Sequence, residues 1–355
     1  MCFPVSVVMS VYNGEQYLKY AIDSILNQVF KDFEFIIVND SSTDETETII
    51  KSYKDSRIIY LKNEKNNGQT ESLNRGIRIS KGVYVARMDQ DDISLPERLS
   101  TQVEFMEQNH NVAVVGTWHQ EIDSKNRLIR KCRFPTKPSV KVRLLFSRLV
   151  GWACISHPTV MVRAKMLSDI GYYDPRYHNC QDHDLWIRVS RRYLIENIPQ
   201  ILLSYRIHPL SSGLRRSDIT VKEMEDIVLS NIDFHLPDAH PDDKAILFRM
   251  LTSKRQAHAR DGERIFGIFN DFYAKVMSAE LADGATKKAY ESWREKLKIF
   301  YLPQLFKTNR ARASKYLAKF SLTFPEVILS RRFYGALKNA IGYGKKNIVR
   351  KVKIF

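Results

Sequence analysis

The chain has 355 residues, of which 44% are hydrophobic and 27% charged, and its formal net charge is +16 at pH 7. This is the composition of an ordinary globular protein, long enough for one large domain and an appendage. Its four cysteines lack CxxC spacing, which excludes a zinc knuckle and a disulfide framework and favours a reduced, cytoplasmic protein. No run approaches the roughly 18 apolar residues that span a bilayer, and no secretion signal is expected at the N-terminus.

The positive charge is concentrated towards the C-terminus. Residues 291–355 hold 16 Lys or Arg against three Asp or Glu, interleaved with Phe, Tyr, Leu and Ile. This pattern predicts peripheral contact with an anionic membrane surface on the cytoplasmic side, and a solvated basic helical face is the alternative. A nucleic-acid-binding protein would spread its charge over a recognition module, so no nucleic acid partner is expected.

Strand and helix patterns alternate over the first 125 residues. Apolar and β-branched runs predict strands at 4–11, 33–38, 57–61 and 83–88. Helical spacing predicts helices at 14–28, before about 53, within 63–82, and from Pro96 to about 108. This βαβα order is typical of a parallel sheet covered on both faces, in which ligands bind beyond the carboxyl ends of the strands.

The rest of the chain is first mixed and then helical. Strands are expected near 112–121, 158–163 and 199–205, and helices near 137–147 and 181–190. After about residue 215 the pattern is almost wholly helical, as in residues 221–234. We therefore expect an α/β domain over residues 1–215, with halves at about 1–110 and 111–215, and a helical, basic region over residues 216–355.

One crevice could collect three polar clusters that follow predicted strands: residues 10–13, 39–44 and 89–92. The last cluster holds Asp89, Asp91 and Asp92, whose like charges repel unless a cation or hydrogen-bond donors neutralise them. Asp89 and Asp91 are hard oxygen ligands two residues apart, which suits Mg²⁺ or Mn²⁺. The alternative is an acidic turn that caps the helix beginning near Leu95, and Asp92 is expected to do only this.

Seven segments carry a resemblance to a known family. They are VSVVMSVYNGEQYLKYAIDSILNQ, DFEFIIVNDSSTDET, NNGQTESLNRGI, ARMDQDDISLPERL, SHPTVM, QDHDLWIRV and LLSYRIH. In this order and spacing, over about residues 4–208, they resemble the inverting family 2 glycosyltransferases. The resemblance implies the GT-A fold, an α/β, Rossmann-like fold with a mixed, mainly parallel sheet flanked by helices. It also implies that residues 1–110 bind the nucleotide and residues 111–215 the acceptor.

The resemblance further implies a nucleotide-sugar site and a metal site. The residues that match the nucleotide-binding segments are Ser10, Tyr12, Asn13, Asp40, Asn67, Gly68 and Asn74. Asp89 and Asp91 match the DXD motif, whose Mn²⁺ or Mg²⁺ bridges the diphosphate of the donor. His208 is a candidate further metal ligand, with a solvated loop histidine as the alternative, and Arg206 could reach the diphosphate.

An inverting transfer also needs a base that takes the proton from the acceptor hydroxyl. Asp182 aligns with the base of the family, and Asp184 is the competing candidate, unless it only pairs with Arg188 four residues later. Contacts with the acceptor are expected from Gln181, which replaces the glutamate common in the family, from Trp186 and from His157. A tryptophan on a helix face is more often part of the core, and a lone histidine more often has a structural role.

The predicted function is a metal-dependent, inverting transfer of a sugar from a nucleotide-sugar to a glycan or lipid-linked oligosaccharide. A UDP-sugar is the first candidate for the donor. The product would belong to a surface polysaccharide. A nucleotidyltransferase acting on sugar phosphates is the enzymatic alternative, but it should show a glycine-rich phosphate loop with a basic residue after the first strand, and SVYNGEQYLKYA does not. A basic nucleic-acid-binding protein is the non-enzymatic alternative.

Overall fold

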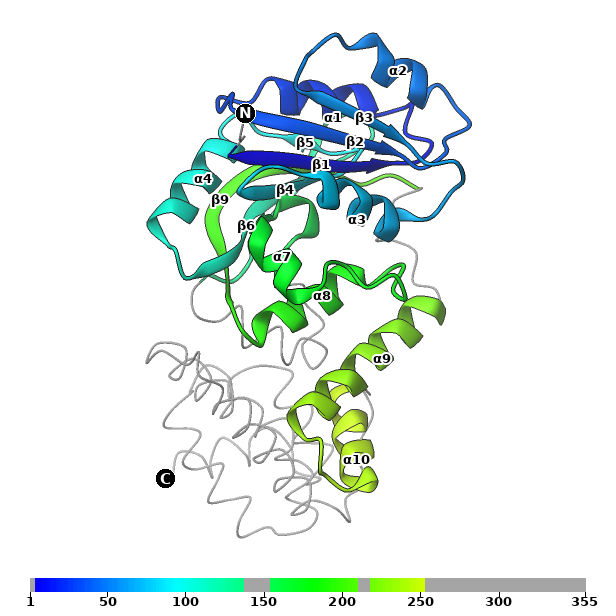
Figure 1. The fold of residues 1–355 in the computed structure, drawn as a ribbon, viewed down its shortest axis with the longest axis vertical. Helices are drawn as coiled ribbons and strands as arrows, with labels where there is room; N and C mark the ends of the chain where they lie inside the picture. Colours follow the sequence, from blue (N-terminus) through cyan, green and yellow to red (C-terminus); the bar gives the residue numbers. More distant parts are fainter. Residues whose placement is uncertain (1–3, 137–153, 210–217, 253–355) are drawn as a thin grey trace, which may run out of the picture. The chain divides into compact units, whose positions relative to one another are not determined.

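The computed structural model describes residues 4–136, 154–209 and 218–252 (Figure 1). The chain divides into two compact units, residues 1–227 and 228–355, and the division falls inside helix α9 (Asp218–His235). The functional domain boundary near 215 stays a prediction. The helix expected near 137–147 and the basic residues 291–355 lie outside the described residues, so the membrane contact stays a prediction. Among the described helices, none is long and apolar enough to cross a membrane.

The described residues of the first unit form one sheet of nine strands. Four neighbours run parallel, in the order β3 (Ile58–Lys62), β2 (Phe33–Asn39), β1 (Val5–Val11) and β4 (Tyr84–Met88). The sheet continues through β8 (Met161–Arg163), β6 (Val112–Ile122), β9 (Leu194–Arg206) and β5 (Ile93–Ser94), with β7 (Leu128–Cys132) paired to β6. In this half β6 and β9 are parallel and the other pairs antiparallel. The predicted α/β fold with a mixed, mainly parallel sheet is confirmed.

Helices cover both faces of the sheet (Figure 1). One core cluster joins alternate residues of β1 and β2 to the helices α1 (Leu18–Leu26), α2 (Thr46–Ser52) and α4 (Arg98–Gln108). The other cluster joins the remaining strand residues to α3 (Gln69–Ile79), α7 (Ala164–Ile170) and α8 (Gln181–Ser190). Because β1 and β2 are buried along their whole length, they read as nearly continuous apolar runs in the sequence.

Several elements differ from the sequence-based prediction. Helix α1 begins at Leu18 and not at 14, and a turn precedes it, in which the Gly14 carbonyl accepts the N–H groups of Tyr17 and Leu18. The strand expected at 158–163 is a 3₁₀ turn (His157–Thr159) followed by β8. The sequence patterns missed β5, β7 and α7. After residue 217 the described elements are α9 and α10 (Pro241–Thr252), and both are helical as expected.

Candidate active site

A cavity of about 850 Å³ lies at the carboxyl ends of β1, β2 and β4, which are parallel neighbours and therefore end at one edge of the sheet. The predicted site residues that line it are Ser10, Tyr12, Asn13, Asp40, Gly68, Asp89, Asp91, His157, Gln181, Asp182 and His208. Those that do not line it are Asn67, Asn74, Asp184, Trp186 and Arg206. The cavity thus collects the three polar clusters and the start of α8.

Asp40 organises the loop that follows β3. Its buried carboxylate accepts the side-chain amide of Asn63 (2.6 Å) and the backbone N–H groups of Asn67 (2.9 Å) and Gly68 (2.8 Å). Gly68 has φ +86°, a left-handed conformation that glycine adopts without strain. Asn67 therefore serves the site through its backbone, while Asp40 and Gly68 border the cavity.

Two side chains tie the loop after β1 to its neighbours. The side-chain Oδ1 of Asn13 accepts the backbone N–H of Thr43 (2.9 Å), which joins this loop to the loop after β2. Gln90 accepts the backbone N–H of Tyr12 (2.8 Å) and donates to the Tyr12 carbonyl (3.1 Å). The Tyr12 side chain remains 46% exposed at the cavity, so its ring offers a face to a ligand. The sequence analysis assigned no role to Gln90.

The three aspartates after β4 form an acidic corner. Carboxylate oxygens of Asp89, Asp91 and Asp92 lie within 4.8 Å of one another and could hold a metal ion, and His208 Nε2 lies 2.8 Å from Asp91 Oδ2. Burial, with Asp91 adding to it, raises the pKa of Asp89 above its ordinary value, while the Arg87 guanidinium opposes the rise. Carboxylate and imidazole ligands fit a divalent cation such as Mn²⁺.

Asp92 does not cap a helix, because α4 begins only at Arg98 and the strand β5 intervenes. Its Oδ1 accepts the backbone N–H of Arg206 (2.8 Å), whereas its buried Oδ2 has no hydrogen-bond partner in the part of the chain that the structure describes. Burial, together with Asp91 and Asp89, raises the pKa of Asp92 well above its ordinary value. An unsatisfied carboxylate oxygen beside two more carboxylates is consistent with a cation at this corner.

Arg87 was overlooked in the sequence analysis. It is buried on β4, lines the cavity and forms an ion pair with Asp89. The available signal was a single charge inside the apolar run 83–88. Such a residue in a strand buried on both faces needs a charged partner, and Asp89 two positions later supplies it.

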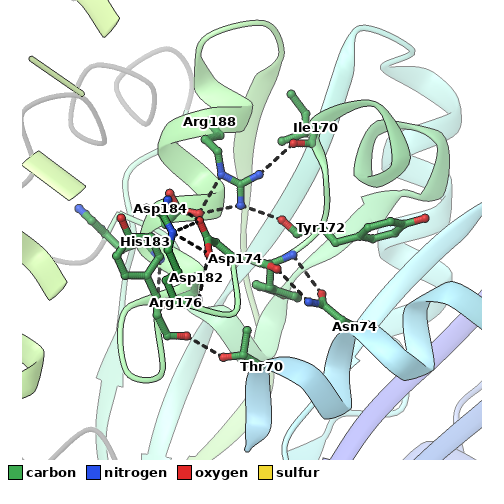
Figure 2. A network of polar contacts seen from close by, with 12 residues as sticks. Thr70, Asn74, Ile170, Tyr172, Asp174, Arg176, Asp182, His183, Asp184 and Arg188 are labelled. Carbon is green, nitrogen blue, oxygen red and sulfur yellow. Dashed lines mark hydrogen bonds and ion pairs between the residues drawn. The ribbon is translucent and has the colours of Figure 1, made fainter. Parts of the chain in front are cut away.

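Arg206 and Asn74, both expected to contact the ligand, contact other parts of the protein. The Arg206 guanidinium lies 4.4 Å from the centre of the Tyr17 ring and donates to the Asp91 carbonyl (2.7 Å), so it supports the backbone of the acidic corner. Asn74 exchanges two hydrogen bonds with the backbone of Tyr173, at 2.8 and 3.1 Å, which ties α3 to the loop after α7 (Figure 2).

The two candidate bases lie in different surroundings on α8. Asp182 lines the cavity and accepts only the neighbouring His183 N–H (2.8 Å) in the contacts described. Asp184 pairs with Arg188 at 2.6 Å, and Arg188 also donates to the carbonyls of Ile170 and Tyr172 (Figure 2). Burial raises the pKa of both carboxyl groups above the ordinary value, and Arg188 opposes the rise at Asp184.

The three expected acceptor residues also differ in placement. Gln181 lines the cavity and donates to the Gln69 side chain (3.0 Å). His157 lines it too, with Nε2 2.7 Å from Tyr173 Oη, and burial lowers the pKa of His157 well below its ordinary value. Trp186 is 2% exposed and belongs to the core cluster under α8, so its ring does not face the cavity.

Comparison with known proteins agrees with this geometry. The sequence model described as Glycosyl transferase family 2 matches residues 6–171. An uncharacterized glycosyltransferase of Methanocaldococcus jannaschii is 41% identical over 217 residues, which are 60% of this chain and 73% of that protein. The chain belongs to glycosyltransferase family 2. This family 2 enzyme is also 34% identical, over 59% of its own length and 81% of the relative's, to the O-antigen biosynthesis glycosyltransferase WbnJ of Escherichia coli.

Solved structures support the fold of this family 2 glycosyltransferase. Residues 1–349 of S. aureus TarS in complex with UDP align with a TM-score of 0.53 over 95% of this chain and 88% of that one, at 19% identity. TarS 1–349 without a named ligand aligns with a TM-score of 0.55 over 91% of each chain, at 17% identity. At such identities the likeness concerns the fold alone. The predictions of family, fold and enzyme class are confirmed.

Proposed function

We propose that this family 2 glycosyltransferase moves a sugar from a UDP-sugar to a hydroxyl of a glycan or lipid-linked acceptor, with inversion, in the synthesis of a surface polysaccharide. The observation that carries the proposal is the cavity itself, since one part presents the acidic corner and another presents the Asp182 carboxylate, which has no cationic partner among the contacts described. Two comparisons support the substrates: WbnJ is named for O-antigen biosynthesis, and TarS structures hold UDP and UDP-GlcNAc.

Asp89, Asp91 and His208 would hold a divalent cation, Mn²⁺ or Mg²⁺. A cation bound there would neutralise the donor diphosphate and stabilise the nucleoside diphosphate as it leaves. Ser10, Asn13 and the exposed Tyr12 ring would border the nucleotide. Beyond the three hydrogen bonds that it already accepts, the Asp40 carboxylate could accept another from an N–H of the base or from a ribose hydroxyl.

Asp182 would take the proton from the acceptor hydroxyl. It faces the cavity, whereas the Asp184 carboxylate is occupied by Arg188. A raised pKa makes a carboxylate a stronger base, and it brings the pKa closer to neutral pH. Gln181 and His157, which also line the cavity, would contact the acceptor. Because burial keeps His157 neutral, this side chain does not lower the pKa of Asp182.

The test is a screen of nucleotide release with UDP-, GDP- and dTDP-sugars, each with Mn²⁺, with Mg²⁺ and with EDTA. We expect release from a UDP-sugar that needs a divalent cation. Asp182→Asn should abolish the release while nucleotide-sugar binding persists, and Asp218→Asn, at an exposed position, is the matched control. Release that persists in EDTA would contradict metal dependence, and release from GDP- or dTDP-sugars alone would contradict the proposed donor.

A further inference from the structure

The first half of α9 holds the loop that leads into α8. Glu223 is 7% exposed, and its carboxylate accepts backbone N–H groups from three consecutive residues: His178 (2.9 Å), Asn179 (2.9 Å) and Cys180 (3.0 Å). Hydrogen bonds to an ionised acceptor are roughly twice as strong as neutral ones. One side chain of α9 therefore fixes three successive backbone units.

Further contacts hold the same loop between α9 and α3. Tyr177 Oη donates to Asp226 Oδ2 (2.6 Å), and Thr70 of α3 donates to the Tyr177 carbonyl (2.8 Å; Figure 2). Tyr177 and Cys180 also belong to a small apolar cluster with Ile227. All these residues lie in the first unit, so residues 218–227 form part of the structure that surrounds the cavity.

The start of α8 depends on this loop. Cys180 occupies the N-cap position, and its side chain makes no capping hydrogen bond. The direction of the first turn is therefore set by the backbone before it. Gln181 and Asp182 of that turn line the cavity, as do residues 178–179 and, from α9 itself, Thr220.

We propose that Glu223 is a positioning residue for sugar transfer: by holding residues 178–180, it sets where Gln181 and Asp182 stand in the cavity. The proposal deepens the proposed function and rests on it for the role of Asp182. It also means that residues needed for activity lie beyond residue 171, where the family match ends, and beyond the domain end expected near 215.

The test compares Glu223→Gln with Asp218→Asn, the same carboxylate-to-amide change at an exposed position of α9. The glutamine amide keeps one acceptor oxygen but turns an NH₂ group towards backbone donors, so it cannot hold all three. Hydrogen–deuterium exchange of amides 178–184 should rise by about tenfold in Glu223→Gln and stay unchanged in Asp218→Asn.

Kinetics give a second readout on the same variants. With Mn²⁺ and UDP-GlcNAc but no added acceptor, kcat for UDP release should fall about tenfold in Glu223→Gln, because the base is misplaced. The Kd for UDP should stay within about twofold, since Asp40 and Tyr12 lie on other elements. Glu223→Asp, which keeps a carboxylate on a shorter side chain, should recover part of the lost kcat.

Unchanged exchange over residues 178–184 in Glu223→Gln would overturn the proposal, whatever the activity. So would an unchanged kcat, or a UDP affinity that falls in parallel with kcat, because Glu223 would then support the whole unit and not the start of α8. If the wild-type enzyme released no nucleotide from any donor, the proposed function would fail, while the exchange comparison would still decide whether Glu223 holds the loop.

Discussion

Replacing Asp182 with asparagine removes the proposed base and preserves its size and its hydrogen bond from the His183 N–H. A general base contributes typically 10²- to 10⁴-fold to the rate, which corresponds to about 3–5 kcal/mol in the barrier. We expect Asp182→Asn to lose that factor in kcat/KM while its stability stays equal or rises slightly, because burial opposes the ionised carboxylate and raises its pKa.

Asp184→Asn should lower the stability of the protein and leave its activity nearly unchanged. The Arg188 guanidinium bonds to Asp184 Oδ2 from two nitrogens, at 2.6 and 2.8 Å, and it would be left facing a neutral amide. Hydrogen bonds to charged groups contribute about 1.5–3 kcal/mol each, so a loss of about 2 kcal/mol in the free energy of unfolding is expected. A unit of this size then melts on the order of 5 °C lower, with kcat nearly unchanged.

The assay pairs thermal unfolding with nucleotide release over a range of pH. In the wild type, the acid limb of kcat/KM should lie above 3.8, the ordinary pKa of the Asp182 carboxyl, because activity is lost as pH falls through the raised pKa of the folded enzyme. Asp182→Asn should lack this limb. An active Asp182→Asn variant together with an inactive but stable Asp184→Asn variant would refute the reasoning and move the base to Asp184.

Other perturbations separate the remaining parts of the site. Asp91→Asn should raise the Mn²⁺ concentration needed for UDP binding about tenfold, measured by calorimetry, and an unchanged requirement would place the cation elsewhere. Asp40→Ala should weaken UDP binding about tenfold with little change in kcat, because the loop after β3 loses three hydrogen bonds, and equal affinity would argue against that role. Burial lowers the pKa of His119 from 6.5 to about 4. The unfolded chain binds more protons between these values, so stability should fall by up to about 3 kcal/mol as pH drops from 6.5 to 4. Urea unfolding should show a flatter profile in His119→Gln, and an identical slope would contradict this.

The strands that form the cavity could be predicted from the sequence because they are buried on both faces of the sheet. Apolar runs predicted strands at 4–11 and 33–38, and the structure has Val5–Val11 and Phe33–Asn39. Parallel order then requires the polar clusters after these strands to meet at one edge, and they line one cavity. The short strand β7 was missed because four of its five residues are exposed, so its sequence does not alternate between buried apolar and exposed polar positions.

The direction of individual side chains could not be predicted in the same way. On a helix, residues two positions apart differ by about 200°, so Asp182 faces the cavity while Asp184 meets Arg188. Arg206 was expected near the diphosphate, but the ring of Tyr17, distant in the sequence, draws its guanidinium inwards. The partner of Arg87 could not be predicted either, because Asp89 matches both an ion pair with Arg87 and a metal ligand.

The partners of the acidic corner are synthesised long after its three aspartates. His208 contacts Asp91 across 117 residues of chain, and the Arg206 N–H reaches Asp92 across 114. A ribosome adds about 5–20 residues per second, so the carboxylates wait on the order of ten seconds for these partners. Strand β5, directly after the corner, pairs with β9 and must wait as well. Until β9 has been made, the nascent chain therefore carries three neighbouring carboxylates with Arg87 as their nearest cation, and this end of the cavity forms late.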